Sequence, residues 1–214
     1  MCEMKKIVLY EGYSCNKPMD NEMIANCSCT LVQAQKNIII DTMTPWDSEK
    51  IIHGLYKRGL NPEDIDYVVS THGHSDHIGN NNLFLKAKHI VGFSVSFKET
   101  YYLHPFNKGV EYKLCDDVQV IPTPGHTLSD VTVIVAGDCD VVAITGDLFE
   151  KSQDIEDPSI WMDAGSEDPV RQRKNRYKIA KLVDWIVPGH GPAFKVTDSM
   201  ITTLKKQLEE NNKS

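Results

Sequence analysis

Thr71-His72-Gly73-His74-Ser75-Asp76-His77 brings three imidazoles and a carboxylate together directly after the mostly apolar segment of residues 65–69. An apolar segment that runs into a glycine predicts a strand followed by a tight turn. In extended chain His72 and His74 are two residues apart and therefore point to the same side. Ser75 stands where a helix N-cap is expected, which puts Asp76 and His77 at the start of the next element. Imidazole nitrogens with one carboxylate oxygen suit zinc, iron or manganese better than calcium.

Three further apolar segments end in loops that carry a histidine or an aspartate. They are Pro122-Thr123-Pro124-Gly125-His126-Thr127, Thr145-Gly146-Asp147 and Pro188-Gly189-His190-Gly191-Pro192. Glycine lets such a loop turn sharply and proline fixes its backbone, so the outgoing side chain is held in place. Loops at strand ends carry functional residues on a rigid scaffold. Four such loops argue against the alternative of a solvated turn that happens to be rich in histidine.

This set of motifs resembles the metallo-β-lactamase superfamily over residues 5–195. The resemblance implies an α/β fold, namely an αββα sandwich of two mixed sheets with helices outside and the site along one edge of the sheets. It implies seven metal ligands, with His72, His74 and His126 on a first metal, Asp76, His77 and His190 on a second, and Asp147 between the two. Asn80 stands where many members have a second glycine, which concerns the subfamily and not a ligand.

The implied chemistry is hydrolysis by two metal ions, Zn²⁺ in the first instance, with iron or manganese suited to the same donors. Two divalent cations facing Asp76 and Asp147 leave positive charge for a bridging hydroxide, because metal coordination lowers the pKa of water from about 15.7 to about 7. That hydroxide can attack a carbonyl carbon or a phosphorus while the second metal stabilises the negative charge that develops. Asp147 as the bridge and Asp76, which also orients the hydroxide, are therefore the expected catalytic residues.

The substrate is less strongly indicated than the chemistry. The strings of residues 71–84 (THGHSDHIGNNNLF) and 145–150 (TGDLFE) resemble one minimal group of the superfamily, which implies a homodimer that cleaves RNA phosphodiesters of the histone pre-mRNA type. A thioesterase of the glyoxalase II type, for whose helical substrate domain the chain is too short, or another hydrolase of small esters is the alternative. A metal-binding protein with a relic site is the non-enzyme alternative, and the full set of ligands argues against it.

Length and composition predict one domain over residues 1–214, because the chain of 24.1 kDa has no long linker, repeat or low-complexity run. The N-terminus lacks the apolar region of a signal peptide, and no segment approaches the length of a membrane span. We therefore expect a cytoplasmic protein, present also in the nucleus, that does not bind membranes. Its six cysteines are then expected as thiols, and Cys27 and Cys29 as core residues rather than metal ligands.

The net charge of −7 argues against a nucleic-acid substrate, since nucleic-acid binders usually have a basic surface. One feature opposes this argument: four basic residues lie at helical spacing on one face, with Arg173 and Arg176 nearby. The four are Arg171, Lys174, Lys178 and Lys181. The alternative interpretation is a solvated helix face.

Periodicity and turn residues predict the remaining elements. The expected strands are residues 7–10, 27–32 and 38–40 as an antiparallel set, then 67–69, 89–93, 118–121, 131–135, 141–145 and 185–187. A helix is expected over residues 47–58 with Ile51, Ile52, Leu55 and Tyr56 on one face. A second is expected over 169–183 with Asp168 as its cap, and a third at the C-terminus with Ile201, Leu204 and Leu208 on one face.

Several polar or aromatic residues lie outside the motifs. Asp41 ends a predicted strand and is either a partner of a ligand histidine or a turn residue. His53 and His89 are expected to be ordinary fold residues. Residues 101–106, with His104 among aromatic side chains, line a substrate groove or else form core or dimer contacts. The acidic residues 154–157 form a solvated loop or a lid.

Overall fold

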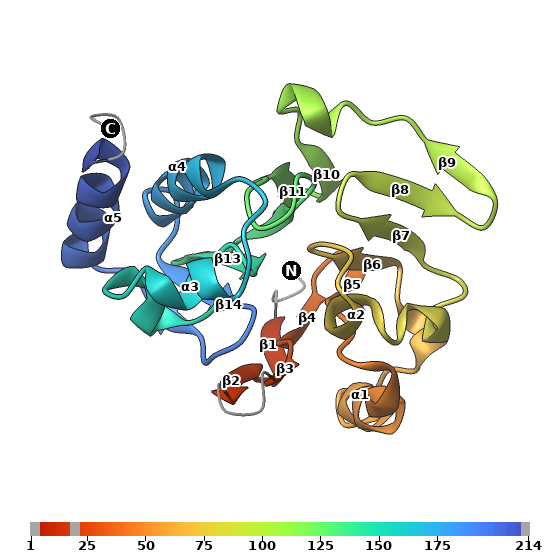
Figure 1. Cartoon of the computed structure of the whole chain (residues 1–214). Coiled ribbons are helices and arrows are strands. Elements are labelled where there is room, and N and C mark those ends of the chain that lie inside the picture. Colours follow the sequence, from red (N-terminus) through yellow and green to blue (C-terminus); the bar gives the residue numbers. More distant parts are fainter. Residues whose placement is uncertain (1–4, 18–21, 211–214) are drawn as a thin grey trace.

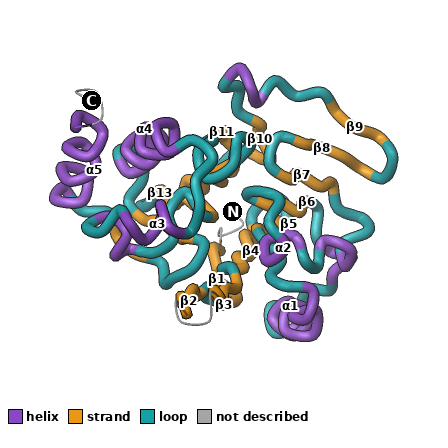
Figure 2. Tube along the Cα trace, viewed as in Figure 1, coloured by secondary structure: helices purple, strands orange, loops and turns teal. Residues whose placement is uncertain are grey.

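The computed structural model of the chain describes residues 5–17 and 22–210, and its backbone forms two large β-sheets that pack face to face (Figure 1). Helix α1 packs on the outer face of one sheet, and α4 and α5 cover the outer face of the other (Figure 2). The two sheets contain parallel and antiparallel pairs, so both are mixed. The αββα sandwich expected from the resemblance is confirmed.

The first sheet has seven strands, of which β5, β6 and β7 run parallel. In spatial order they are β1 (Lys5–Tyr10), β4 (Cys29–Gln33), β5 (Asn37–Ile40), β6 (Tyr67–Ser70), β7 (Lys88–Val91), β8 (Ser94–Phe97) and β9 (Thr100–Tyr102). The predicted antiparallel set of β1, β4 and β5 is confirmed. The strand predicted over residues 89–93 ends at Val91, because Gly92 adopts a φ of +52° and turns the chain into β8.

The second sheet has six strands, and only its β13–β14 pair is parallel within the described residues. Its order is β10 (Tyr112–Cys115), β11 (Val118–Pro122), β12 (Val131–Ala136), β13 (Val141–Gly146), β14 (Trp185–Pro188) and β15 (Phe194–Lys195). A separate hairpin of β2 (Tyr13–Lys17) and β3 (Glu22–Asn26) was not predicted. Neither were the short strands β8, β9, β10 and β15.

The α-helices are α1 (Ser48–Tyr56), α2 (Ser75–Ile78), α3 (Ser159–Asp163), α4 (Pro169–Ala180) and α5 (Asp198–Glu210). Short 3-10 turns are η1 (Pro45–Asp47), η2 (Pro62–Asp64), η3 (Asn81–Leu83), η4 (Phe106–Lys108) and η5 (Ser152–Ile155). As predicted, the Asp168 side chain caps α4 by accepting a hydrogen bond from the Arg171 amide. No helix in residues 5–17 and 22–210 has the length and apolar character needed to cross a bilayer.

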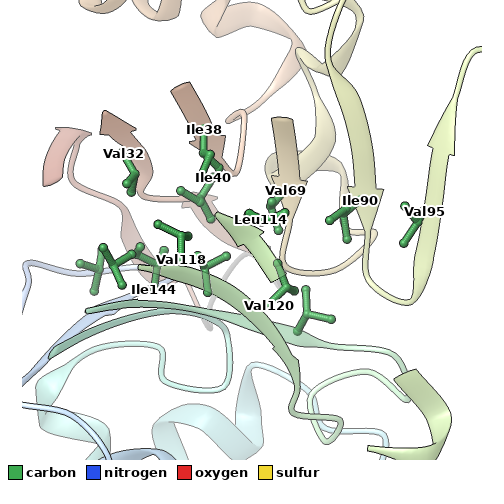
Figure 3. Close-up of a cluster of buried hydrophobic side chains, with 14 of the residues drawn as sticks. Val32, Ile38, Ile40, Val69, Ile90, Val95, Leu114, Val118, Val120 and Ile144 are labelled. Carbon is green, nitrogen blue, oxygen red and sulfur yellow. The ribbon is translucent and has the colours of Figure 1, made fainter. Parts of the chain in front are cut away.

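The main core lies between the two sheets (Figure 3). Alternate residues of the first sheet, such as Ile38 and Ile40, meet alternate residues of the second, such as Val118 and Val120, because side chains in a strand alternate between the two faces. Each such side chain contributes about 1.5–3 kcal/mol when it is fully buried. Two further cores join the outer faces of the sheets to the helices. The site-bearing loops thus extend from a rigid framework.

Two local predictions for the helices were wrong. In α1, Ile51 and Leu55 are buried, but Ile52 is 42% and Tyr56 73% exposed, so the buried face is narrower than predicted. The other concerns Ser75, which is the first residue of α2 and not its cap. The preceding His74 occupies the N-cap position, and no side chain there makes a capping hydrogen bond.

The segment of residues 154–157 is not a wholly solvated loop, because Asp154 is fully buried. Its carboxylate accepts hydrogen bonds from both terminal nitrogens of Arg176, at 2.6 and 3.0 Å, and Arg176 is also fully buried. Arg176 further donates to the Leu148 carbonyl at 2.8 Å and lies over the ring of Phe149. The pair therefore ties α4 to the loop that follows β13.

Arg176→Ala should destabilise the protein by about 3–5 kcal/mol, because it leaves the Asp154 carboxylate buried without its partner. Lys174→Ala, an exposed position on the same helix, is the matched control and should change stability by about 0.5 kcal/mol or less. Urea unfolding of the two variants measures the difference. Equal unfolding midpoints for Arg176→Ala and the wild type would contradict the assigned role of the pair.

Candidate metal centre

The seven residues assigned as metal ligands come together at one edge of the sandwich, although they come from four separate loops. His72, His74, Asp76 and His77 follow β6 and enter α2. His126 lies between β11 and β12, Asp147 directly follows β13, and His190 follows β14. The structure therefore brings four strand-end loops together at one place.

The first group consists of His72, His74, His126 and one oxygen of Asp147. His74 Nδ1 lies 2.9 Å from His72 Nε2 and 3.1 Å from His126 Nε2. Asp147 Oδ2 lies 3.6 Å from His72 Nε2 and 3.4 Å from His126 Nε2. Ligands about 2.0–2.1 Å from a tetrahedral zinc are about 3.3 Å from one another. The four donor atoms are thus spaced as one small cation requires.

The second group consists of Asp76, His77, His190 and the other oxygen of Asp147. Asp147 Oδ1 lies 3.2 Å from His77 Nε2 and 3.3 Å from His190 Nε2. Asp76 Oδ2 lies 3.9 and 3.7 Å from the same two nitrogens. Asp147 Oδ2 also lies 3.3 Å from His190 Nε2, so the carboxylate lies between the two groups and is close to donors of both.

Three atoms of the second group are buried and have no hydrogen-bond partner among the described residues: Asp76 Oδ2, His77 Nε2 and Asp147 Oδ1. A buried polar atom without a partner is costly, and each such atom calls for an explanation. Here the three point toward one another with carboxylate and imidazole chemistry, so the residues present fit a bound cation.

The outward nitrogens of the imidazoles are held by hydrogen bonds that fix the rings. His126 Nδ1 donates to the Gly165 carbonyl at 2.7 Å, and His190 Nδ1 donates to the Asn26 carbonyl at 3.0 Å. A ring that donates from Nδ1 has its Nε2 lone pair free for a metal. The backbone thus selects the tautomer needed for metal binding at both positions.

Asp41 supports His77 from behind. Its carboxylate lies 3.0 Å from His77 Nδ1 and accepts from the Thr71 amide at 2.7 Å. Asp41 also has a φ of +55°, an unusual conformation for an aspartate. Both interpretations left open by the sequence therefore apply, since Asp41 is a turn residue that contacts a histidine of the site.

Gly189 lies against the Asp147 carboxylate. A Cβ atom at position 189 would lie 1.9 Å from Asp147 Oδ1. Any other residue there would displace either the carboxylate or the loop that carries His190. The glycine of the predicted Pro188-Gly189-His190 loop is thus required by close packing at the site.

The metal-free site is strongly polarised. Burial lowers the pKa of His72 well below its ordinary value. Burial also tends to lower the pKa of His77 and of His190, but the nearby Asp147 carboxylate outweighs it. The pKa of His77 is therefore raised well above its ordinary value, and that of His190 is raised to about 9. Burial also favours neutral Asp147, yet His77 and His190 hold the pKa of Asp147 well below its usual range. At neutral pH, His77 and His190 therefore carry protons that a metal ion would displace.

Glu150 is a site residue that the sequence reasoning did not select. It is 2% exposed, and its carboxylate lies with Asp147 and His190 in one group of potential ligand atoms. Burial, followed by the charge of Asp147, raises the pKa of Glu150 well above its ordinary value. The signal in the sequence that could have identified Glu150 was its position three residues after Asp147. The chain turns tightly there, with the Phe149 amide donating to the Gly146 carbonyl.

The site opens into a pocket of about 240 Å³. His74, Asp76, His126, Asp147, Glu150 and His190 line it. Met23 and Ala25 of the unpredicted hairpin form part of the wall, and Ala164, which follows α3, forms another part. The pocket is therefore mostly polar, with a small apolar border.

The residues expected to lie outside the site do so. His53 is exposed on α1, and the ring of His89 contacts the Phe84 carbonyl at 3.1 Å. Cys27 and Cys29 are buried in the core beneath α1, as predicted, and burial raises the pKa of both thiols. Cys27 Sγ also lies with Asp41 and His77 in one group of potential ligand atoms behind the site.

Residues 101–106 divide between the core and the surface. Phe106 is a core residue that stacks on Phe93, with ring centroids 5.5 Å apart. Tyr101 and Leu103 are 68% and 100% exposed at the edge of the first sheet. His104 packs edge-on against Phe106, with centroids 4.4 Å apart.

With this fold and site in place, comparison with known proteins identifies the class. Residues 24–190 match the model of the metallo-beta-lactamase superfamily, and the chain belongs to this superfamily. It is accordingly a metal-dependent hydrolase whose described residues include two His/Asp clusters suited to metal ions.

Two similar proteins share one name, metallo-beta-lactamase domain-containing protein 1. The Xenopus laevis protein is 40% identical over 209 residues, which cover 96% of this chain and 86% of that protein. The human protein is 41% identical over 166 residues, 76% of this chain. The matched part spans only 61% of the human protein, less than two thirds of its length.

Solved structures agree on the fold. A Thermotoga maritima protein described as a metallo-beta-lactamase aligns with a TM-score of 0.67 at 22% identity, covering 90% of this chain and 99% of that one. AidC, described as a dizinc quorum-quenching lactonase, aligns with a TM-score of 0.59 at 20% identity, covering 80% of this chain and 75% of that one.

We expect the metal-free chain to bind about two Zn²⁺ ions, because seven donors exceed what one four-coordinate zinc can use. Binding at pH 7.5 should release about three protons, two from His77 and His190, since each ligand must be deprotonated, and one from a bound water whose pKa falls to about 7. Because the pKa of His190 is about 9, apparent affinity should rise with pH up to that value. Calorimetry in buffers of different ionisation enthalpy measures the protons.

His190→Ala should release about one proton fewer, and His53→Ala, which changes an exposed ring, should match the wild type. Binding of a single zinc ion by the wild type would contradict the two-cluster assignment. Zinc binding without proton release at pH 7.5 would contradict the proposed charge state of the metal-free site.

Glu150→Gln should stabilise the metal-free protein at pH 8 and have little effect near pH 4. Glu150 has a raised pKa in the folded state, while in the unfolded chain its pKa is about 4.3. Ionisation therefore opposes folding increasingly as pH rises above about 4.3, and glutamine removes that penalty. Thermal unfolding in chelator across this pH range measures the effect, with exposed Glu156→Gln as control. A pH-independent difference would show that Glu150 is already ionised in the fold.

Proposed function

We propose that this metal-dependent hydrolase uses two zinc ions to cleave RNA phosphodiester bonds. The observation that supports an RNA substrate is a row of four exposed cations on and just after α4, namely Arg171, Lys174, Lys178 and Lys181. Arg176, which the sequence placed near this row, is buried in its ion pair and takes no part.

The cationic face lies next to the metal centre because α4 packs against the loop that carries His126. Asn175 Nδ2 donates to the Pro124 carbonyl at 2.7 Å, and the Asp168 amide donates to the Gly125 carbonyl at 2.9 Å. Gly125 also lies so close to Gln172 that a Cβ would be 2.4 Å from the Gln172 Cα. Phosphates near the metal centre would therefore be near the cations of α4.

When bound, the two metal ions would supply a water of lowered pKa and positive charge to stabilise the transition state. His72, His74 and His126 would hold the first, Asp76, His77 and His190 the second, and Asp147 both. Asp76 reaches the pocket from the N-terminal turn of α2 and would orient the attacking water. Asp41 would keep the His77 ring in position. Zinc is preferred within this proposal, and iron and manganese share the same donor preferences.

The histone pre-mRNA type of substrate, the homodimer and the cytoplasmic or nuclear location belong to the same proposal and derive from the sequence resemblance. The exposed Tyr101 and Leu103 at the β9 edge offer a surface for a second copy. Sedimentation analysis of the purified protein tests the dimer, which a monomer at all concentrations would refute.

A second candidate is hydrolysis of a small ester or thioester. It is supported by the likeness of the fold to a quorum-quenching lactonase and by the apolar border of Met23, Ala25 and Ala164 at the metal pocket. This reaction uses the same metal centre but gives no role to the cations of α4.

Zinc-loaded protein should cleave single-stranded RNA, and Asp147→Ala should abolish cleavage while the fold survives, because it removes the donor shared by both clusters. RNA, a thioester and a lactone are assayed side by side, with exposed His53→Ala as the active control. Rapid cleavage of the thioester or lactone, with none of RNA, would replace the first candidate by the second. RNA cleavage by metal-loaded Asp147→Ala would remove Asp147 from the bridging role.

A further inference from the structure

A second hollow, of about 430 Å³, lies on the α4 side of the loop between β11 and β12. It is larger than the metal pocket and shares no lining residue with it. We call it the α4 groove, and its lining consists of Phe93, Phe106, Asn107, Gly109, Pro122, Pro124, Leu128, Arg171, Lys174, Asn175 and Lys178. No acidic residue is among these, although the chain has 30 acidic and 23 basic residues.

One wall of the α4 groove is cationic. Arg171, Lys174 and Lys178 follow one another at helical spacing and are exposed. Within the described residues, neither Lys174 nor Lys178 forms an ion pair, and Arg171 lies 3.3 Å from Asp168. From Arg171 to Lys178, a step of seven residues, the helix rises about 10 Å. This length matches about three nucleotides at the 3.4 Å spacing of a stacked strand.

Much of the remaining lining is apolar. Phe93 is half-buried and is supported by its stack on Phe106, and Leu128 is 56% exposed. Pro122 and Pro124 complete this surface. A single strand offers phosphates on one side and the faces of its bases on the other, and such grooves combine cations with apolar platforms. A small inorganic anion would need no apolar wall, and a duplex would hide its base faces.

The groove and the metal pocket share one loop. His126 faces the metal cluster, and Leu128, two residues later, faces the groove. Two carboxylates beside this loop are already engaged, since Glu167 accepts from the Leu128 amide at 2.7 Å and Asp168 caps α4. Neither lines the groove, and Asp130 of the same loop is buried and accepts from the amides of Gly125 and Thr127.

From this arrangement we infer that the α4 groove binds about three nucleotides of single-stranded RNA that flank the bond cleaved at the metal centre. This inference depends on the proposed RNA substrate. It adds the position of the RNA strand on the protein and the reason why the RNA must be single-stranded. The phosphates contact Arg171, Lys174 and Lys178, and the bases lie against Phe93 and Leu128.

The test compares two double variants of the zinc-loaded protein that lose the same charge. Lys174→Gln with Lys178→Gln changes the groove, whereas Lys57→Gln with Lys206→Gln changes exposed lysines that belong neither to the groove nor to the row of cations on α4. Binding of a labelled single-stranded oligonucleotide of about twelve nucleotides is measured against salt. Each lost phosphate contact reduces the slope of log affinity against log salt by about 0.7, so the groove variant should lose about 1.4 and the control much less.

Two further measurements separate the groove from the metal centre. Hydrolysis of bis(p-nitrophenyl) phosphate, which is too small to reach the groove from the metal pocket, should be the same in the groove variant and the wild type. Leu128→Ser, at an exposed position, should weaken single-strand binding about fivefold or more while leaving the salt slope unchanged, because it removes apolar contact and no charge.

The outcomes distinguish this inference from the proposed function. Equal salt slopes for the two double variants, with RNA still cleaved, would contradict RNA binding in the α4 groove and leave the proposed nuclease activity standing. RNA binding that depends on the α4 groove, without cleavage, would support the groove as a binding site and contradict the proposed nuclease activity. Equal affinity for duplex and single strand, or equally strong competition by poly-glutamate peptide, would overturn the assignment to single-stranded RNA.

Discussion

The metal centre depends on one buried carboxylate, Asp147, which lies between two groups of imidazoles. Its two oxygens lie within 3.2–3.6 Å of nitrogens from His72, His77, His126 and His190. Without a cation, this arrangement requires protons on some of the rings, which is why the pKa of His190 rises while burial lowers that of His72. The strands that end at these residues must therefore keep a register that holds all the donors within this narrow range of distances, since a one-residue slip in any strand would turn its ligand away.

The loops of the site could be predicted from the sequence because glycine, proline and histidine mark them directly. The packing of two sheets followed from the family resemblance and not from periodicity, because the alternation along a strand shows which residues are buried and not what covers them. The β2–β3 hairpin was missed because Met23 and Ile24 are exposed and its other residues are mostly polar, so no apolar alternation marks it. Glu150 was missed because its role depends on the turn after β13, which brings it back to Asp147.

Helix α4 shows why charge patterns need a structure for their interpretation. Its buried face contains Gln172 and Arg176 together with Ile179 and Ala180, so polarity alone gives the wrong orientation. Gln172 donates to the Asp147 carbonyl at 3.0 Å and Arg176 to the next carbonyl, that of Leu148. The polar residues on this face thus hold two successive backbone carbonyls, those of Asp147 and Leu148. Lys174 and Lys178 are exposed on the other side of the helix, where they line the groove.

The net charge of −7 and a polyanionic substrate are compatible when the positions of the charges are considered. Electrostatic screening in physiological salt has a length of about 8 Å, so exposed charges farther away than this have little influence on a bound phosphate. What matters is the sign of the groups that line the binding surface, and the described lining of the α4 groove has three cations and no carboxylate. Acidic residues elsewhere, such as Asp116 paired with Lys113, contribute to solubility without opposing a strand in the groove. The overall charge therefore limits long-range attraction of RNA but does not decide whether the groove can hold it.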